Sequence, residues 1–277
     1  LMMRPTAVAG SFYPADAGEL TRALERCFAA CAGPADGPAP RALICPHAGY
    51  IYSGASAAAA CASVPEDSRI ETVVIIGPNH TGLGPPVSIS DSDEWATPFG
   101  AVPVDRALGE SLAAAFPAAS FDSLAHAREH SIEVQLPLLQ FRLGRPFGIL
   151  PIVLGLPAST SGHEVCAGLG RALAEVAAPD RTLLLASTDM SHYLSASDAR
   201  RRDRAAIDAV LALDSADLVR AVRQNGISMC GVMPSAAVIA AAVTLGASGA
   251  ELADYRTSGD VTGDDREVVS YAAFVIR

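Results

Sequence analysis

The sequence predicts a single α/β domain over residues 1–277, with a mostly parallel central sheet and helices on both faces. Apolar runs without polar alternation recur along the chain, as expected for strands that are covered on both faces. Stretches with apolar residues at helical spacing separate these runs, and such alternation is typical of parallel βαβ units. The chain is long enough to bury a large core, and neither an internal repeat nor a long linker divides it.

The first third of the chain is expected to begin irregularly and then to enter the sheet. Residues 4–14 are rich in turn-forming residues, whereas 17–32 has apolar residues at helical spacing and is opened by Asp16. Residues 33–40 form a link rich in proline, glycine and alanine. The elements expected next are a strand from Ala42, a closely packed helix of small residues over 53–63 and a buried strand over 73–76.

The middle of the chain is expected to combine edge structure with a further βαβ unit. Short strands over 86–90 and 95–105, with glycine and proline turns between them, indicate antiparallel or edge strands beside the main sheet. Trp95 is interpreted as a packing residue. The remaining elements are a helix over 106–116, a helix over 127–136 that Pro137 kinks or stops, a buried strand over 147–154 and a returning helix over 162–177.

The last third is predicted to complete the sheet and to add three helices. An apolar strand starts at Thr182, and two helices follow over 198–213 and 214–225, each opened by an aspartate. The alanine-rich run 236–245 is too short to span a membrane and is interpreted as a buried helix. Two closing strands, over 252–256 and 268–276, flank an acidic loop, 260–265, whose spacing does not fit an EF-hand and which is interpreted as a surface turn.

Composition and charge exclude several classes of protein. The hydrophobic share of 50% indicates a globular chain, and the net charge of −10, without any lysine, argues against a nucleic-acid partner. The densest basic run, residues 200–204, is interpreted as a solvated helix face. The cysteines form no paired framework and the N-terminal stretch has no secretion-signal pattern, so we expect a reduced, cytoplasmic protein without a membrane segment.

Polar side chains follow three of the predicted strands at the point where each strand ends. His47 and His80 each come shortly after an apolar run that stops at a proline, and the strand from Thr182 runs out into Asp189 and His192. Because the carboxyl ends of parallel strands meet at one edge of a sheet, we expect these side chains to lie close together.

A second, local pattern suggests a different metal site. Residues 126–130 match H-x-x-E-H, in which two histidines on one helix bind zinc and Glu129 serves as a base in some metalloproteases. The pattern is short, Pro137 follows closely and no third ligand is evident, so the peptidase reading is disfavoured. In the other interpretation, His126 caps a helix or faces solvent, and His130 with neighbouring polar residues forms an edge near the cleft.

The dispersed residues fit a metal site better than the local pattern does. Cys230 lies in a turn before the alanine-rich helix, where it can present a thiolate to a cleft. Two imidazoles, from His47 and His80, together with one anionic ligand would bind a metal and leave coordination positions open. Each histidine taken singly is more often a structural residue, but the repetition of strand, breaker and histidine favours a joint site.

A series of motifs across residues 5–274 resembles the Memo family, which includes the AmmeMemoRadiSam system protein B group. The motifs are PTAVAGSFYP, CPHAGYIYSG, IIGPNHTG, ATPFG, EHSIEVQLP, STDMSHY, CGVMPSAA and the ending YRTSGDVTG followed by VVSYAAF. The resemblance implies a fold similar to that of the class III extradiol dioxygenases, which hold non-haem Fe(II) by two histidines and a glutamate. By this resemblance His47 and His80 match the histidine ligands, and Cys230 stands in place of the carboxylate.

The resemblance also implies roles for three further residues. His192 matches the acid/base histidine of those dioxygenases and His130 matches a second pocket histidine, while Asp189 would orient or assist. A thiolate is softer than a carboxylate and can be oxidised, so Cys230 favours zinc, copper or a redox-active iron over ordinary ring-cleavage chemistry.

Two functions from different classes follow from the resemblance. The first is a metal-binding, oxygen-dependent oxidoreductase with non-haem iron or copper and a small-molecule or peptide ligand. The alternative is a non-catalytic binding or signalling module that recognises phosphorylated peptides. The system name further implies an association with a radical enzyme, to which no residue of the chain can be tied.

Overall fold

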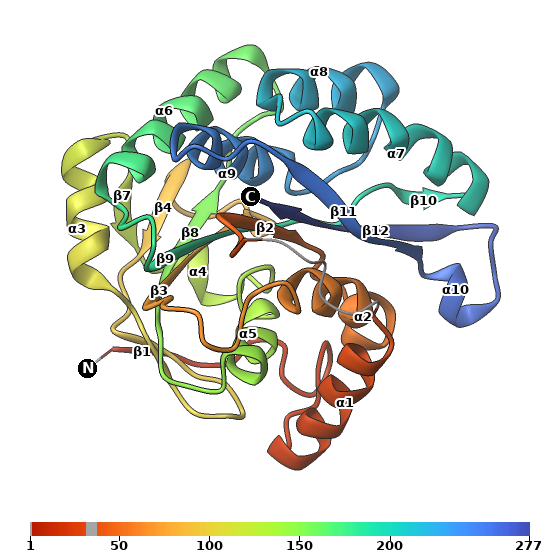
Figure 1. The fold of residues 1–277 in the computed structure, drawn as a ribbon, viewed down its shortest axis with the longest axis horizontal. Coiled ribbons are helices and arrows are strands. Elements are labelled where there is room, and N and C mark those ends of the chain that lie inside the picture. Colours follow the sequence, from red (N-terminus) through yellow and green to blue (C-terminus); the bar gives the residue numbers. More distant parts are fainter. Residues whose placement is uncertain (1, 32–37) are drawn as a thin grey trace.

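A nine-stranded mixed sheet forms the centre of the computed structural model, which describes residues 2–31 and 38–277 (Figure 1). Four adjacent parallel strands make up its middle, and almost all their residues are buried, as the apolar runs predict. In spatial order they are β2 (Ala42–Cys45), β9 (Thr182–Ser187), β3 (Thr72–Pro78) and β8 (Gly148–Leu154).

Antiparallel strands extend this parallel core on both sides. Beside β2 lies β12 (Val268–Ile276), which also pairs with β10 (His192–Leu194) and β11 (Ala250–Thr257). Beside β8 lies β4 (Val87–Ser90), followed by β7 (Ser120–Asp122). The strand predicted over 86–90 is confirmed as β4, whereas 95–105 contributes only two-residue strands to a separate sheet. Strands β7 and β10 are not predicted, since each has three residues and little apolar pattern.

Helices cover both faces of the sheet, as predicted. In Figure 1 one group of helices lies above the sheet and another below it. The upper group comprises α6 (Thr160–Val176), α7 (Ala196–Leu211), α8 (Ser215–Asn225) and α9 (Val232–Thr244), and α3 (Arg106–Ala115), at the left of the view, packs against α6. The lower group comprises α1 (Ala17–Ala29), α2 (Tyr50–Cys61) and α5 (Gln135–Leu143).

Each face of the sheet has its own apolar core because side chains alternate along a strand. Ile44 and Ile76 pack with the upper helices, whereas Leu43 and Ile75, their neighbours in β2 and β3, pack with the lower ones. Within the described residues no helix has the length and hydropathy that a membrane span requires.

A small second sheet ties the N-terminal segment to the body of the protein. It consists of β1 (Met3–Arg4), β5 (Glu94–Trp95) and β6 (Val102–Pro103). The Arg4 guanidinium lies 4.2 Å from the centre of the Trp95 ring, and both side chains are buried. Trp95 is therefore a packing residue, as expected, and the first residues of the supposedly irregular segment 4–14 are anchored in the core.

The predicted helix over 127–136 is wrong. The chain forms one turn of helix, α4 (Leu124–Ala127), then runs irregularly until α5 begins at Gln135. The Glu129 carboxylate accepts hydrogen bonds from backbone N–H groups of Ser131 and His80, which favours a local turn over a continuous helix. Pro137 falls in the first turn of α5, where backbone N–H groups have no acceptor within the helix. The absence of an N–H on Pro137 therefore costs no helical hydrogen bond, and the proline neither kinks nor stops the helix.

Several predicted boundaries move by a few residues. Helix α1 ends at Ala29, and most of the predicted link 33–40 lies outside the described residues. Helix α7 is capped by the Ser195 hydroxyl rather than opened by Asp198, whereas Asp214 caps α8 as predicted. The acidic loop contains a short helix, α10 (Gly259–Thr262).

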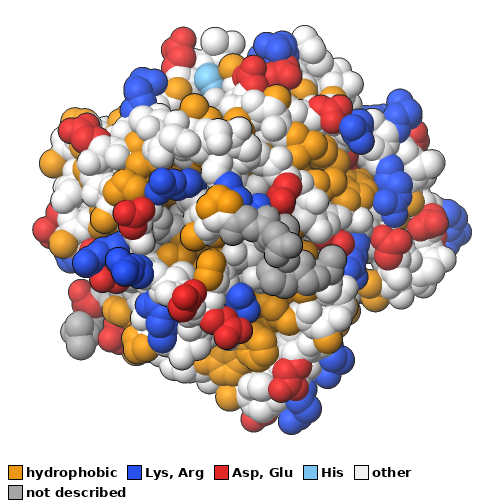
Figure 2. Space-filling view, in the orientation of Figure 1, with side chains coloured by type: hydrophobic (Ala, Val, Ile, Leu, Met, Phe, Trp, Pro, Cys, Tyr) orange, Lys and Arg blue, Asp and Glu red, His pale blue; other side chains and the backbone are white. Residues whose placement is uncertain are grey.

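The basic run on α7 lies on a solvent-exposed helix surface, as interpreted. Three of its four arginines also pair with acidic residues of α7 and α10, in the pairs Arg200–Asp260, Arg201–Asp198 and Arg204–Asp208. On the face shown in Figure 2, basic and acidic side chains are interspersed, and the described residues there form no continuous basic stripe.

Candidate metal centre

Three neighbouring strands and one turn bring the predicted donors together. His47 follows β2 and His80 follows β3, while Asp189 follows β9, which lies between them in the sheet. Cys230 stands in the turn before α9. Its neighbour Gly231 permits a close approach to the end of β9, because an added Cβ there would lie 2.3 Å from the Ser187 carbonyl oxygen.

The donor atoms of His47, His80 and Cys230 all lie within 4.8 Å of one another. The Cys230 Sγ is 3.4 Å from Nε2 of His47, and the two imidazole rings meet edge to face with centroids 5.3 Å apart. Two imidazole nitrogens and one sulfur at this spacing form a donor set suited to zinc, copper or iron. The sequence-predicted set is thus assembled as three converging donors.

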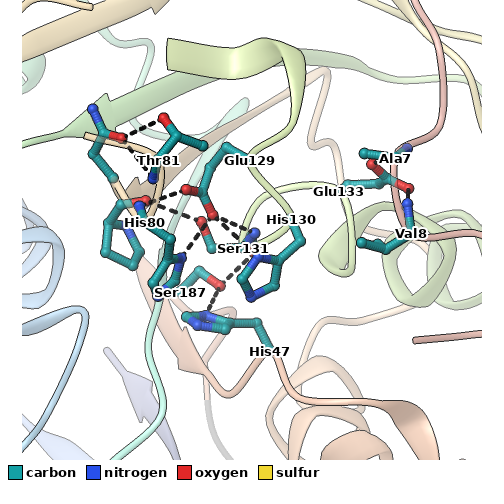
Figure 3. Close-up of polar contacts among 12 residues, drawn as sticks. Ala7, Val8, His47, His80, Thr81, Glu129, His130, Ser131, Glu133 and Ser187 are labelled. Atoms are coloured by element: carbon teal, nitrogen blue, oxygen red, sulfur yellow. Dashed lines mark hydrogen bonds and ion pairs between the residues drawn. The ribbon is translucent and has the colours of Figure 1, made fainter. Parts of the chain in front are cut away.

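Glu129 fixes the orientation of His80 (Figure 3). Its carboxylate accepts hydrogen bonds from the backbone N–H of His80 at 2.7 Å and from Nδ1 of the same residue at 2.9 Å. Burial lowers the pKa of His80, but the hydrogen bond to Glu129 and the charge of Glu129 raise it overall above its ordinary value of 6.5. Because the carboxylate holds the Nδ1 proton, Nε2 is the nitrogen at which a metal would replace a second proton, as in the carboxylate–histidine–metal arrangement common in proteins. Burial alone would raise the pKa of Glu129, but the hydrogen bonds and charge of His80 lower it to about 2.

His130 lies beside the other two histidines. Its ring stacks on His80 with centroids 4.6 Å apart and meets His47 edge to face at 5.3 Å, while Phe12 packs against it at 4.8 Å. Burial, and then the charge of His47, lowers the pKa of His130 to about 4. His130 therefore carries a neutral ring beside His47 and His80 at pH 7.

A second donor group overlaps the first. His80, Glu129 and His130 also have donor atoms within 4.8 Å of one another, which supplies two histidines and a carboxylate. The Glu129 oxygens, however, already accept hydrogen bonds from His80 and from the Ser131 N–H in a fully buried position. The geometry therefore favours Glu129 as the residue that orients His80 and Cys230 as the third donor.

Cys230 is held as a neutral thiol in the protein without a bound metal. Burial, and then the negative charge of Asp189, raises its pKa to about 12. Its sulfur lies 3.2 Å from the backbone N–H of Asp189, which donates to it. Because a metal ligand must be the thiolate, binding of a metal at Cys230 would release a proton.

Asp189 and His192 flank this donor set. The Asp189 Oδ1 accepts the backbone N–H of His47 at 2.8 Å, and burial raises the pKa of this carboxyl group. His192 begins β10, and its Nδ1 lies 3.1 Å from the Ser228 carbonyl oxygen. A carbonyl can only accept, so His192 carries its proton on Nδ1 and leaves Nε2 free to take up another.

His126 takes no part in the site, which corrects the role that each interpretation of the local motif gave to this residue. Its ring is 1% exposed, its Nε2 lies 3.1 Å from the Ser88 carbonyl oxygen, and it meets Trp95 edge to face. His126 and His130 do not share a helix, since α4 ends between them. His126 is therefore a buried structural residue rather than a cap, a solvent-facing residue or a zinc ligand.

Several residues near the donors escape sequence reasoning. Ser187 and Ser131 hydrogen-bond beneath His47, and Phe12 reaches His130 from the N-terminal segment. Their residue types carry no chemical signal, and their proximity depends on the irregular segment 128–134. A cavity of about 960 Å³ between α1 and α2 is lined in part by Phe12 but by none of the predicted donors.

The fold and the donor set define an α/β protein with a candidate metal centre at the carboxyl ends of parallel strands. The model of Memo-like proteins matches residues 4–275, so the chain belongs to the Memo-like protein family.

Curated relatives match over nearly the whole chain. A MEMO1 family protein of Methanopyrus kandleri is 43% identical over 285 residues, which cover 100% of this chain and 99% of that protein. A MEMO1 family protein of Aquifex aeolicus is 42% identical, with 99% of both chains covered. A crystal structure of an uncharacterized protein from Escherichia coli K12 covers 83% of this chain and 98% of its own, with a TM-score of 0.53 and 15% identity, and therefore shares the fold.

Proposed function

We propose that the protein binds one transition-metal ion through His47, His80 and Cys230 and acts as an oxygen-dependent oxidoreductase. The observation that carries this proposal is the convergence of the three donor atoms within 4.8 Å at the carboxyl ends of two parallel strands. Iron is the metal we favour, with copper or zinc as the alternatives that a thiolate donor also accepts.

The metal would supply redox chemistry with oxygen, and the protein residues would supply orientation and proton transfer. Glu129 holds His80 so that its free nitrogen faces the site, and the Asp189 carboxylate fixes the backbone of His47. His192, with its Nδ1 proton held by Ser228, can accept a proton at Nε2 from a bound ligand. His130 and Phe12 form an uncharged wall on which a planar ligand can pack.

The first test is the metal content of protein purified without added metal or chelator. We expect near-stoichiometric metal in the wild type and its loss in Cys230→Ala and His80→Ala. Cys166→Ala is the matched control, because Cys166 is a buried thiol in α6 away from the site. Metal that survives both site substitutions would contradict the proposed ligands.

The second test separates catalysis from binding. Oxygen uptake by the metal-loaded protein with reductants or phenolic substrates is expected to fall about 10²–10⁴-fold in His192→Ala, as for a lost acid/base group. Unchanged uptake at unchanged metal content would refute that role. Phosphorylated-peptide binding that survives removal of the metal, without oxygen uptake, would instead identify the binding module.

A further inference from the structure

Ser187, the last residue of β9, is buried beneath His47 and contacts three polar groups. Its Oγ lies 2.6 Å from the Ser131 carbonyl oxygen, 2.9 Å from Nε2 of Gln135 and 2.8 Å from Nδ1 of His47. A serine hydroxyl has one proton to donate and two lone pairs with which to accept. All three contacts are hydrogen bonds only if Ser187 donates once and accepts twice.

Two of the three roles are fixed by the partners. The Ser131 carbonyl oxygen can only accept, so the Ser187 proton points to it. The Gln135 amide nitrogen also lies 2.9 Å from the Pro46 carbonyl oxygen, which again can only accept. A rotated amide would place its oxygen against that carbonyl, so Gln135 must donate to both Pro46 and Ser187.

One lone pair of Ser187 is left, and Nδ1 of His47 must donate to it. We propose that Ser187 is a positioning residue that holds neutral His47 in the Nδ1–H tautomer. The Nε2 lone pair then faces Cys230 Sγ, 3.4 Å away, before a metal arrives. The purpose of this arrangement rests on the proposed metal function, whereas the tautomer is a property of the metal-free protein.

The comparison with His80 explains why a hydroxyl is needed here. His80 is oriented by the charged Glu129, and a second carboxylate beneath His47 would add negative charge close to Asp189, which already bonds the His47 backbone. The Ser187 hydroxyl is neutral, and because it donates its own proton to the Ser131 carbonyl oxygen it can only accept a hydrogen bond from Nδ1 of His47. Removal of a residue that hydrogen-bonds to a metal ligand typically lowers the affinity for the metal 10–100-fold.

The test is the histidine tautomer in metal-free protein labelled with ¹⁵N, read from long-range ¹H–¹⁵N spectra at pH 8. We expect His47 to be Nδ1–H in the wild type and to gain the Nε2–H form in Ser187→Ala. Cobalt(II) affinity should fall roughly 10–100-fold in Ser187→Ala, with altered sulfur-to-cobalt absorption bands. Ser187→Thr, which keeps the hydroxyl, should restore the tautomer.

Ser90→Ala is the matched control, because Ser90 is a buried serine of β4 whose Oγ accepts the Trp95 indole N–H at 3.0 Å. It should leave both the His47 tautomer and the cobalt affinity unchanged. An Nε2–H tautomer in the wild type would overturn the proposal even if Ser187→Ala did not fold. Unchanged tautomer and affinity in a folded Ser187→Ala would also overturn it. A correct tautomer in a wild type that binds no metal would support the positioning role and refute the proposed function.

Discussion

Two buried carboxylates in the segment 128–134 face opposite directions and stabilise different parts of the protein (Figure 3). Glu129 points to His80, whereas Glu133 accepts the Ala7 and Val8 N–H groups and pairs with Arg4. A buried carboxylate is tolerated when its lone pairs are filled, as here. The same few residues thus orient a candidate ligand and anchor the N-terminal segment.

Loss of the Glu133 charge should strongly destabilise the fold. Glu133→Gln leaves the buried Arg4 guanidinium without its ion partner, for which we expect a loss of about 3–5 kcal/mol in the free energy of unfolding. Urea denaturation measures this loss in the free energy of unfolding. The control Glu66→Gln, which removes an exposed carboxylate that pairs with the partly buried Arg142, should cost less than about 1 kcal/mol. Equal losses in the two variants would show that burial of the Arg4–Glu133 pair is unimportant.

His126 should make stability depend on pH. Burial lowers its pKa in the folded protein from 6.5 to about 4, so between these values the unfolded chain binds a proton that the folded chain does not. The stabilising contribution is therefore complete above pH 6.5 and is lost as the pH falls towards 4, by up to about 3 kcal/mol.

The measurement is the difference in unfolding free energy between the wild type and His126→Gln, taken at pH 7 and at pH 4. Glutamine can keep the hydrogen bond to the Ser88 carbonyl oxygen but does not titrate. The wild type should lose about 3 kcal/mol more than the variant on acidification. An equal loss of unfolding free energy between pH 7 and pH 4 in the two proteins would contradict the lowered pKa of His126.

At the scale of elements, helices α6 and α9 pack at unusually close range. A Cβ added at Gly170 of α6 would lie 2.7 Å from the Cβ of Ala240 and 2.8 Å from the backbone nitrogen of Ala241 in α9. The small residues of both helices are therefore a packing requirement, because backbone atoms cannot move aside as a flexible side chain can.

Gly170→Ala should accordingly destabilise the protein by roughly 1–3 kcal/mol, although alanine favours helices by about 1 kcal/mol over glycine. Chemical denaturation measures this change in the free energy of unfolding. Gly249→Ala, at a position with no atom within 4 Å of the added Cβ, should change stability by less than about 0.5 kcal/mol. Stabilisation by Gly170→Ala would mean that α6 can shift away from α9.

The sequence predicts the regular elements well because their signals are local. The buried strands and the stripe of α1 follow from hydrophobic periodicity, and Asp214 identifies the start of α8. The segment 128–134 cannot be predicted this way, since Glu129 and Glu133 are satisfied by residues far away in the sequence. The donors His47, His80 and Cys230 could be proposed from strand ends and motifs, whereas Ser187 and Phe12 could not, since their roles arise from packing.

At the scale of the whole molecule, the strand order decides which side chains can meet. Because β9 lies between β2 and β3, His47, Asp189 and His80 come from three neighbouring strands rather than from distant positions on the sheet. Hydrophobic runs specify that the strands are buried but not their order. The convergence of these residues is thus a property of the fold as a whole.

A bound metal should stabilise this whole arrangement. Because the donors come from separate elements, a metal that binds the folded chain at 100 times its dissociation constant adds about 2.7 kcal/mol, which should raise Tm by several degrees. Thermal unfolding with increasing zinc measures the shift. Cys230→Ala should lose most of it and Cys166→Ala none, and an equal shift in Cys230→Ala would place metal binding elsewhere.

The separation of 183 residues between His47 and Cys230 has a consequence for biosynthesis. At translation rates of roughly 5–20 residues per second, His47 is made about 10–40 s before the thiol that it faces. For most of that interval β2 also lacks its neighbour β9, and throughout it lacks β12, which follows Cys230 in the chain. The nascent polypeptide therefore contains His47 and His80 before Cys230, and the complete proposed set of donors must await the finished fold.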